Sequence, residues 1–136
     1  IGFWAFYGCK SLLEINICST VEFIGRGAFM RCHSLRKVEF ESSSPYQLKT
    51  IGPSAFDNCF SLQRIKTPSS VNVIGERSFG NCEVLVESNL STTSIKEIPR
   101  LGIGQCRSLQ TVSLPNSLER ICDHAFFHCF CLVTVV

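Results

Sequence analysis

Apolar and polar positions follow one pattern along this chain, and the pattern returns at nearly constant intervals. It reads Ile-Gly-x-x-Ala-Phe-x-x-Cys, and a leucine stands three residues after each cysteine. It occupies residues 1–9, 24–32, 51–59, 74–82, 98–106 and 121–129. The copy at 98–106 is degenerate, with Pro99, Gly102 and Ile103 where Gly, Ala and Phe are expected. This regular spacing predicts a protein built from structural repeats.

Two kinds of local structure are expected within each repeat. After the leucine, apolar residues tend to recur with a period of two, as in Val38 and Phe40, which is typical of a short half-buried strand. Thr67 and Ser88 are polar exceptions at such positions. Within Ala-Phe-x-x-Cys, apolar groups lie three and four residues apart, which favours a single helical turn.

A turn and a second apolar pair connect each strand to the next copy of the pattern. Pro68 and Pro115 begin two of these turns, because proline presets the backbone φ angle. The apolar pair, such as Val71 and Ile74, ends on the first isoleucine of the pattern. The glycine that follows is expected to allow a tight corner or a close approach of two backbones.

One unit of about 23 residues cannot enclose its own apolar face, so the units are expected to stack in register. The predicted fold class is an α/β repeat solenoid over residues 1–136, with about six copies. We expect a right-handed coil with a parallel strand ladder on one face and turns or short helices on the other. Inserts at 41–45 and near Thr93 are expected to bulge outward. The phenylalanines of the pattern are expected in the core: Phe6, Phe29, Phe56, Phe79 and Phe126.

The repeat resembles the BspA-like leucine-rich repeats, whose units have about 23 residues. The resemblance rests on the whole template and on segments such as Cys32-His33-Ser34-Leu35 and Cys59-Phe60-Ser61-Leu62. It implies a surface-exposed or secreted protein of the kind implicated in adhesion and in binding host proteins. Departures from the template are Cys18, Cys122 and Cys131, which stand where Pro, Gly and Ser are common.

Composition and charge argue against several classes of partner. Hydrophobic residues make up 45% of the 136 residues, which supplies a core, and a net charge of +2 gives no electrostatic reason to expect nucleic acid. The longest apolar run, 130–136, is far shorter than the roughly 20 residues of a membrane span, so no membrane insertion of this segment is expected. Because the chain begins and ends inside repeat units, we expect it to be a fragment of a longer array.

No catalytic or cofactor-binding motif is found. The chain has no Gly-x-Ser-x-Gly elbow, phosphate-binding glycine loop or His-Glu-x-x-His pair. His124 and His128 are four residues apart and would share a helical face, so a zinc site is conceivable. Surface histidines flanking the core pair Ala125 and Phe126 are the plainer interpretation. We therefore expect no catalytic residue, no metal and no cofactor.

Nine cysteines are present, and six of them follow the repeat: Cys9, Cys32, Cys59, Cys82, Cys106 and Cys129. Free cysteine is among the most buried residue types, so this set is expected to form a buried apolar column. Side chains in a parallel stack point the same way, which makes disulfides between copies difficult. Cys18, Cys122 and Cys131 lie outside the column and are better candidates for oxidation or pairing.

The outward positions of the predicted strands form the candidate protein-binding face. One column holds Glu14, Lys37, Arg64, Glu87 and Thr111, and a second holds Asn16, Glu39, Lys66, Asn89 and Ser113. Opposite charges are adjacent in these columns, so they either neutralise one another or form a polar face that docks an acidic or mixed partner. In the second case Lys37, Arg64 and Lys66 form its basic centre. Asn89 also begins a glycosylation sequon.

The function expected from these features is a non-enzymatic protein-interaction or adhesion module that presents a rigid curved surface. Its partner would be another protein, with a host or matrix surface protein as a candidate, and its location the cell surface or the secreted fraction. Two alternatives stay open: a structural spacer without a ligand, and an intracellular scaffold whose cysteines stay reduced.

Overall fold

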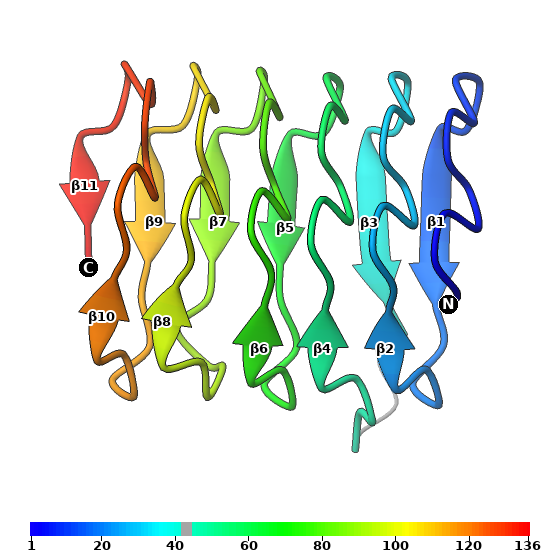
Figure 1. Cartoon of the computed structure of the whole chain (residues 1–136), viewed down its shortest axis with the longest axis horizontal. Coiled ribbons are helices and arrows are strands. Elements are labelled where there is room, and N and C mark those ends of the chain that lie inside the picture. The colour runs from blue at the N-terminus through cyan, green and yellow to red at the C-terminus, as the bar shows by residue number, and fades with distance from the viewer. Residues whose placement is uncertain (42–44) are drawn as a thin grey trace.

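The computed structural model describes residues 1–41 and 45–136 as a stack of coils with two rows of short strands (Figure 1). The first row holds the strands that follow the leucine of each repeat: β1 (Glu14–Ile17), β3 (Lys37–Phe40), β5 (Arg64–Lys66), β7 (Glu87–Asn89), β9 (Thr111–Ser113) and β11 (Thr134–Val135). The second row holds the strands that end on the isoleucine of the pattern: β2 (Phe23–Ile24), β4 (Thr50–Ile51), β6 (Val73–Ile74), β8 (Glu97–Ile98) and β10 (Arg120–Ile121).

All the strand pairs are parallel, and each joins equivalent residues of adjacent coils. In the first row β1 pairs with β3, and β5, β7, β9 and β11 form one continuous sheet. In the second row β2, β4 and β6 form one sheet, and β8 pairs with β10. The predicted stacking of repeats into a parallel-strand solenoid is therefore confirmed.

The core is a set of columns that run along the stack, as the repeat predicts. Phe29, Phe56 and Phe79 are fully buried, and their rings are nearly parallel, with centroids 5.1 Å and 5.6 Å apart. Phe6 and Phe126, in the first and last copies, are only partly buried. Each coil thus closes the apolar face of its neighbour, and the interior coils are enclosed on both sides.

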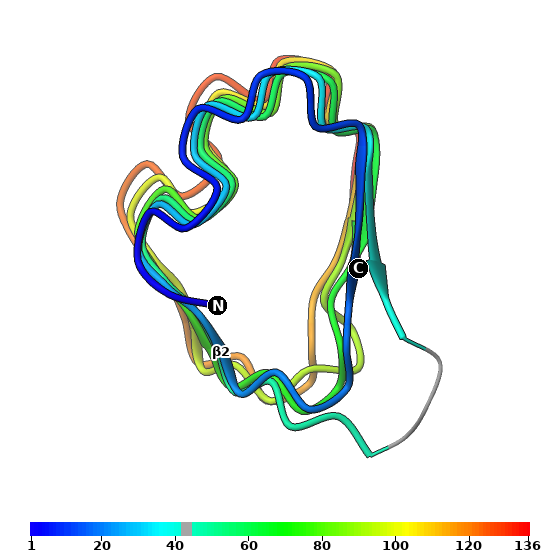
Figure 2. The same cartoon turned by 90° about the vertical axis from the view of Figure 1, so that its right-hand side faces the viewer.

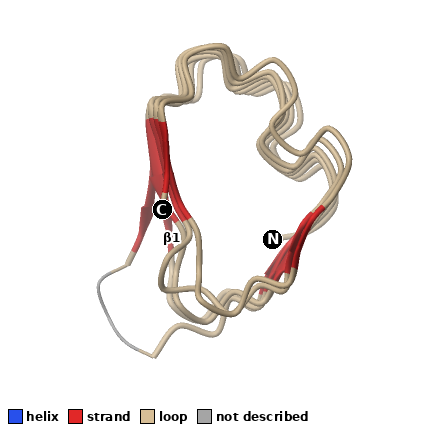
Figure 3. Ribbon diagram, turned by 90° about the vertical axis from the view of Figure 1, so that its left-hand side faces the viewer, coloured by secondary structure: helices blue, strands red, loops and turns tan. Residues whose placement is uncertain are grey.

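The predicted α/β class and its short helices are not confirmed, because residues 1–41 and 45–136 contain no helix (Figure 3). In the Ala-Phe-x-x-Cys segments, backbone N–H groups alternate between two kinds of acceptor. The N–H of Phe29 donates to the carbonyl of Ala55 in the next coil (2.8 Å), whereas that of Met30 donates back to Gly27 (3.0 Å). The segment is therefore a run of turns, and half of its hydrogen bonds join coils.

Left-handed backbone conformations recur in every coil and exclude a helix at these corners. Two residues, four apart, have positive φ in each copy of the pattern. They are Trp4 and Gly8, Gly27 and Arg31, Ser54 and Asn58, Arg77 and Asn81, Leu101 and Gln105, and His124 and His128. Most of these are not glycine, so the strain at each corner is offset by the hydrogen bonds between coils.

The insert at 41–45 interrupts the regular outline of the coils. Residues 42–44 lie outside the described part of the chain, so the predicted bulge cannot be followed through them. On both sides of them the chain departs from the outline shared by the other coils (Figure 2). At the second insert, Thr93 is buried and its hydroxyl donates to the carbonyl of Leu90 (2.7 Å), which closes a tight turn.

The two polar exceptions in the strand pattern are buried without hydrogen-bond partners. Thr67 and Ser88 are fully buried, and within the described residues neither hydroxyl oxygen has a partner. A buried unpaired hydroxyl costs about 1–3 kcal/mol, so these two sites lower the stability of the central coils.

A membrane-spanning helix is not found in the part of the chain that the structure describes.

Candidate functional site

The ten predicted binding residues lie on the first row of strands, and they are in the predicted register within each of its two sheets, β1–β3 and β5–β11. Strand pairing aligns Glu14 with Lys37 and Asn16 with Glu39. Beyond β3 it aligns the remaining members of both columns: Arg64, Glu87 and Thr111 in the first, and Lys66, Asn89 and Ser113 in the second. Whether this face binds a partner stays a prediction, but its side chains share one exposed or half-exposed surface.

Only one of the expected ion pairs between coils is formed on this face, among the residues that the structure describes. Arg64 Nη1 lies 3.1 Å from Glu87 Oε2. Lys37 instead pairs with Glu39 on its own strand, with Nζ 2.9 Å from Oε1. This contact with Glu39, with a smaller contribution from Glu14, raises the pKa of Lys37. Ion pairs between adjacent coils therefore neutralise only some of the charged side chains of this face.

The face is divided by a seam between β3 and β5. Both strands pair with their outer neighbours, β1 and β7, but no backbone hydrogen bond between β3 and β5 is found among the described residues. After β3, on both sides of residues 42–44, the described chain departs from the common outline (Figure 2). The interruption of the ladder therefore falls in the same coil as the departure from the common outline.

An open groove of about 920 Å³ lies over the seam. It is lined by β3 and β5 and by side chains of adjacent segments: Glu14, Arg36, Lys37, Val38, Glu39, Phe40, Tyr46, Gln63, Arg64, Lys66, Thr67, Pro68, Ser69 and Thr92. The lining combines four cationic side chains with two carboxylates. The predicted basic centre, Lys37, Arg64 and Lys66, therefore lies within the groove.

Sequence reasoning missed Arg36, Phe40 and Tyr46 as groove residues. Arg36 directly precedes β3, and its position is occupied by Leu13 and Gln63 in the adjacent copies, so no column of like residues marks it. The period of two assigns Phe40 to the core. The irregular repeat length around 41–45 is the one signal that this coil differs from the others.

The prediction of a buried cysteine column is confirmed for the four interior copies and is wrong for the two ends, where Cys9 is exposed and Cys129 is half-buried. Cys32, Cys59, Cys82 and Cys106 are fully buried, whereas Cys9 is exposed, and all nine cysteines are free thiols. Each buried thiol donates a hydrogen bond to a carbonyl of the preceding coil. The acceptors are Phe6, Phe29, Phe56 and Phe79, at 3.1, 3.2, 3.4 and 3.1 Å. This column is structural, because buried protonated thiols are poor nucleophiles.

We expect the protein to lose stability at alkaline pH because of this column. Burial raises the pKa of Cys32 to about 11 and also raises the pKa of Cys59. Between about pH 9 and 11 the unfolded thiols are ionised while the folded ones keep their protons, so unfolding releases protons and stability falls as pH rises. Urea unfolding under reducing conditions at about pH 8 and about pH 10.5 should show this fall.

The matched control is Cys32→Ala, which removes one buried thiol from the column. Its free energy of unfolding should fall less steeply over the same pH range than that of the parent chain. Equal slopes for the two proteins would assign the alkaline loss to other groups.

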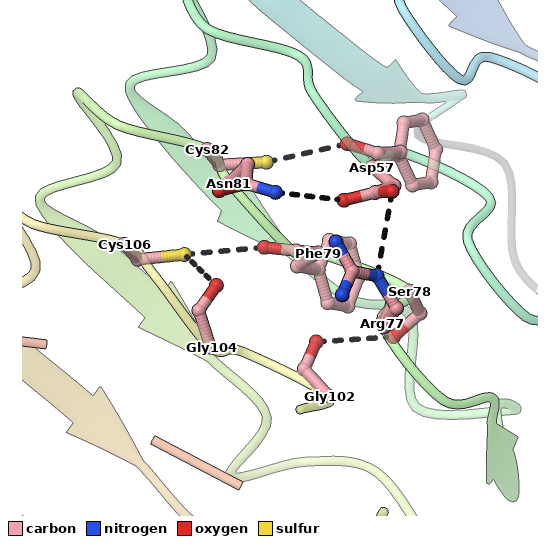
Figure 4. A network of polar contacts seen from close by, with 10 residues as sticks. Asp57, Arg77, Ser78, Phe79, Asn81, Cys82, Gly102, Gly104 and Cys106 are labelled. Atoms are coloured by element: carbon pink, nitrogen blue, oxygen red, sulfur yellow. Dashed lines mark hydrogen bonds and ion pairs between the residues drawn. The ribbon is translucent and has the colours of Figure 1, made fainter. Parts of the chain in front are cut away.

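A buried carboxylate lies among the turns beside this column (Figure 4). Asp57 is almost completely buried; Arg77 Nε lies 3.5 Å from its Oδ2, and the Asn81 amide donates to its Oδ1 at 3.4 Å. Burial raises the pKa of Asp57, and Arg77 opposes this shift. The partners belong to the next coil, so the network fastens two coils together.

The two histidines considered for a metal site do not share a helical face. Both His124 and His128 have positive φ and lie in the corner turns. His128 stacks on Phe127, with ring centroids 3.8 Å apart, and His124 meets the same ring edge-on at 5.4 Å. Among the described residues no group of three or more His, Cys, Asp or Glu side chains could hold a metal ion.

The sequon asparagine ends β7 on the strand face. Asn89 is half-buried, and its side-chain oxygen accepts hydrogen bonds from the backbone N–H of Ser91 (3.1 Å) and from the Ser91 hydroxyl (2.8 Å). Its modification stays a prediction. A glycan there would extend from the same surface as the groove.

Comparison with known proteins identifies the repeat. A sequence model of the BspA type leucine rich repeat region matches residues 1–133 in six copies. No curated protein matches the chain.

Three crystal structures of bacterial proteins share the fold. A Treponema pallidum leucine rich repeat protein, TpLRR, is 29% identical with a TM-score of 0.79, and the match covers 98% of this chain and 71% of that one. A Bacteroides ovatus leucine-rich repeat protein is 30% identical, with a TM-score of 0.69 and coverage of 100% and 40%. A Faecalibacterium prausnitzii leucine rich cell surface protein is 27% identical, with a TM-score of 0.77 and coverage of 99% and 41%. The chain spans less than half the length of the last two.

Proposed function

Because this chain belongs to the BspA type leucine-rich repeat family, we propose that it is a non-enzymatic protein-interaction module that docks a partner on its strand face. Leucine-rich repeat proteins commonly mediate protein interactions, and solenoids in general bind along their extended surfaces. The observation that supports this assignment most is the open groove of about 920 Å³ over β3 and β5, which contains the basic centre.

The non-enzymatic part of the proposal is supported by the chemistry of the cysteines and of the buried Asp57. The buried thiols are protonated and bonded to carbonyls of the adjacent coil, and Asp57 is paired with Arg77 and Asn81. These groups hold coils together. Because these cysteines and Asp57 stabilise contacts between coils, they are not available as catalytic groups, which favours a binding function over catalysis.

The finer proposal is adhesion at the cell surface, with a host or matrix surface protein as the partner. Its support is the similarity to the F. prausnitzii protein, which is described as a leucine rich cell surface protein. The protein would then present this strand face outside the cell.

The test of the proposed function is binding of the 136-residue chain to arrayed host surface and matrix proteins, followed by titration of each protein that binds. Replacing Lys37, Arg64 and Lys66 together with glutamate should weaken binding by about tenfold or more, because the basic centre becomes acidic. Circular dichroism should show an unchanged fold, since all three side chains are exposed.

A control with the same change in charge uses exposed cations outside the strand face: Lys10, Lys49 and Arg107, each replaced by glutamate. This variant should bind as well as the parent chain. Equal losses in both variants would show that net charge, and not the strand face, governs binding. Retained binding by the strand-face variant would contradict the proposed site, and no binding at all would favour a spacer.

A further inference from the structure

The groove over the seam contains two cations that no carboxylate of the described chain neutralises. Lys37 and Arg64 each have a carboxylate within 3.1 Å. Arg36 and Lys66 are exposed, line the same groove, and form no ion pair with any residue of 1–41 or 45–136. Two unpaired cations in one groove provide binding positions for two anionic groups.

The seam explains why Lys66 lacks a carboxylate partner in the described part of the chain. Continuation of the repeat register would place Glu39 beside Lys66 on the next strand, and such pairs stabilise exposed ladders. The ladder is interrupted between β3 and β5, and Glu39 turns to Lys37 on its own strand. Within the described residues, Lys66 is therefore a cation without a carboxylate partner, where a continuous ladder would have neutralised it.

The groove is nevertheless unsuited to a uniformly charged polyanion. Glu14 and Glu39 line it together with the cations, and they would repel a sulfated polysaccharide or a nucleic acid. A peptide can place a basic side chain or an amide donor near these carboxylates and acidic side chains near the cations. The mixed charges of the groove therefore favour a peptide segment of mixed composition.

Two aromatic residues supply an apolar contact in the groove. Phe40 and Tyr46 line it, and both are half-buried, so each exposes part of its ring to a ligand. Burial of an apolar side chain against such rings contributes about 25 cal/mol for each Å² removed from water. The ligand should therefore include an apolar residue close to its acidic ones.

The length of the groove also fits a short extended peptide. Its lining reaches from Glu14 in β1 to Thr92, just after β7, and so crosses four adjacent coils. Strands in a sheet are about 4.8 Å apart, so this distance is roughly 14 Å, which corresponds to about four extended residues.

We infer that the groove over the β3–β5 seam binds an extended segment of a partner protein that carries two carboxylates beside an apolar side chain. The carboxylates contact Arg36 and Lys66, and the apolar side chain lies against Phe40 and Tyr46. This inference rests on the proposed function and assigns the partner's chemistry at that site.

The experiment is selection of a phage-displayed library of random peptides, about ten residues long, on the intact chain. The selected peptides should be enriched in closely spaced Asp and Glu residues next to an apolar residue. The tightest of them, made synthetically with a fluorescent label, should bind about tenfold more weakly to a variant with Arg36→Gln and Lys66→Gln. Added salt should also weaken peptide binding, because the contacts of the carboxylates with Arg36 and Lys66 are exposed to solvent.

The matched control replaces two exposed cations outside the groove, Lys10→Gln and Arg107→Gln, and should leave the affinity unchanged. Tyr46→Ser should weaken binding without changing its dependence on salt, because it removes an apolar contact only.

The outcomes separate this inference from the proposed function. The selected peptides could lack acidic enrichment and bind the Arg36→Gln, Lys66→Gln variant as tightly as the unmodified chain. If they also lost affinity when Lys37, Arg64 and Lys66 become glutamate, the inferred peptide chemistry would be overturned, and the strand face would remain the binding site. A heparin oligosaccharide could displace the labelled peptide at a lower concentration than the unlabelled peptide does. This result would identify a polyanion site and overturn the inference. Failure to select any peptide that binds the strand face would overturn the inference, while the proposed function would still be decided by the binding of arrayed proteins.

Discussion

Replacing Phe56 by alanine should lower the free energy of unfolding by about 3–5 kcal/mol, the range measured for buried aromatic side chains. Phe56 is fully buried between the rings of Phe29 and Phe79, with centroids 5.1 Å and 5.6 Å away. The cavity would therefore open on two neighbouring coils at once. In an array where each coil contacts only its neighbours, the loss should spread to both of them.

Urea unfolding followed by circular dichroism measures this loss, and the comparison variant is Phe130→Ala. Phe130 is 71% exposed, so the same deletion removes little buried area and should change stability by less than about 1 kcal/mol. Similar losses for the two variants would mean that Phe56 does not belong to a shared interior column.

Replacing Gly75 by alanine should be at least as damaging, because two backbones meet at this glycine. A Cβ at residue 75 would lie 2.7 Å from the carbonyl carbon of Gly52 and closer still to the backbone N of Pro53. The Gly75 N–H also donates to the carbonyl of Ile51 (2.8 Å), which fixes the spacing between coils. Backbone atoms cannot rotate away as a side chain does, so we expect a loss of about 3 kcal/mol or more.

The chain provides its own control for this prediction. Gly2 occupies the same position of the repeat, but a Cβ there would meet no atom within 4 Å. Gly2→Ala should therefore leave the urea midpoint nearly unchanged. If Gly2→Ala and Gly75→Ala had the same effect, the glycine would act through local conformation and not through contact between coils.

The degenerate copy lacks this glycine and has Pro99 in its place. The second row of strands is interrupted there, between β6 and β8. Proline has no N–H to donate to the preceding coil, so the ladder cannot continue through it. The expectation of a close backbone approach after each isoleucine is therefore confirmed at the interior copies that keep the glycine, such as Gly52 and Gly75.

The strands, their register and the core could be predicted because each depends on residues that repeat. Leu35, Phe56 and Cys82 are buried as the pattern requires, since a residue in the same position of each copy meets the same neighbours. The pairing of Arg64 with Glu87 is a consequence of the same register. Periodicity along the sequence thus fixes distances in space wherever the coils are uniform.

The corners could not be predicted in the same way. The spacing of Ala28, Phe29 and Cys32 fits a helical turn, and a single sequence cannot show that alternate N–H groups bond to the next coil. Arg77 and Leu101 adopt positive φ without the glycine that usually marks this conformation. Hydrogen bonds between coils override the local preference, and they become visible only once the stack is formed.

The groove itself was not predicted from the sequence, although three of its cations were assigned to the strand face. Lys37, Arg64 and Lys66 could be placed on one face from the register, but a uniform repeat predicts a continuous ladder and not the seam between β3 and β5. Arg36 and Tyr46 belong to no repeated column, so nothing in the pattern assigned them a neighbour. The proposed binding surface therefore lies where the repeat is irregular, and periodicity predicts least there.

The most direct test of the stacked solenoid is the measurement of nuclear Overhauser effects between phenylalanine rings in the selectively labelled chain. Phe29 and Phe56 are far apart in sequence, yet their ring centroids are 5.1 Å apart, so their ring protons should show strong cross-peaks. Phe56 and Phe79 should also show them, at 5.6 Å, whereas Phe29 and Phe79 should not. Absence of both neighbour contacts, or a strong contact between Phe29 and Phe79, would contradict the stacking of successive repeats on which the core and the groove depend.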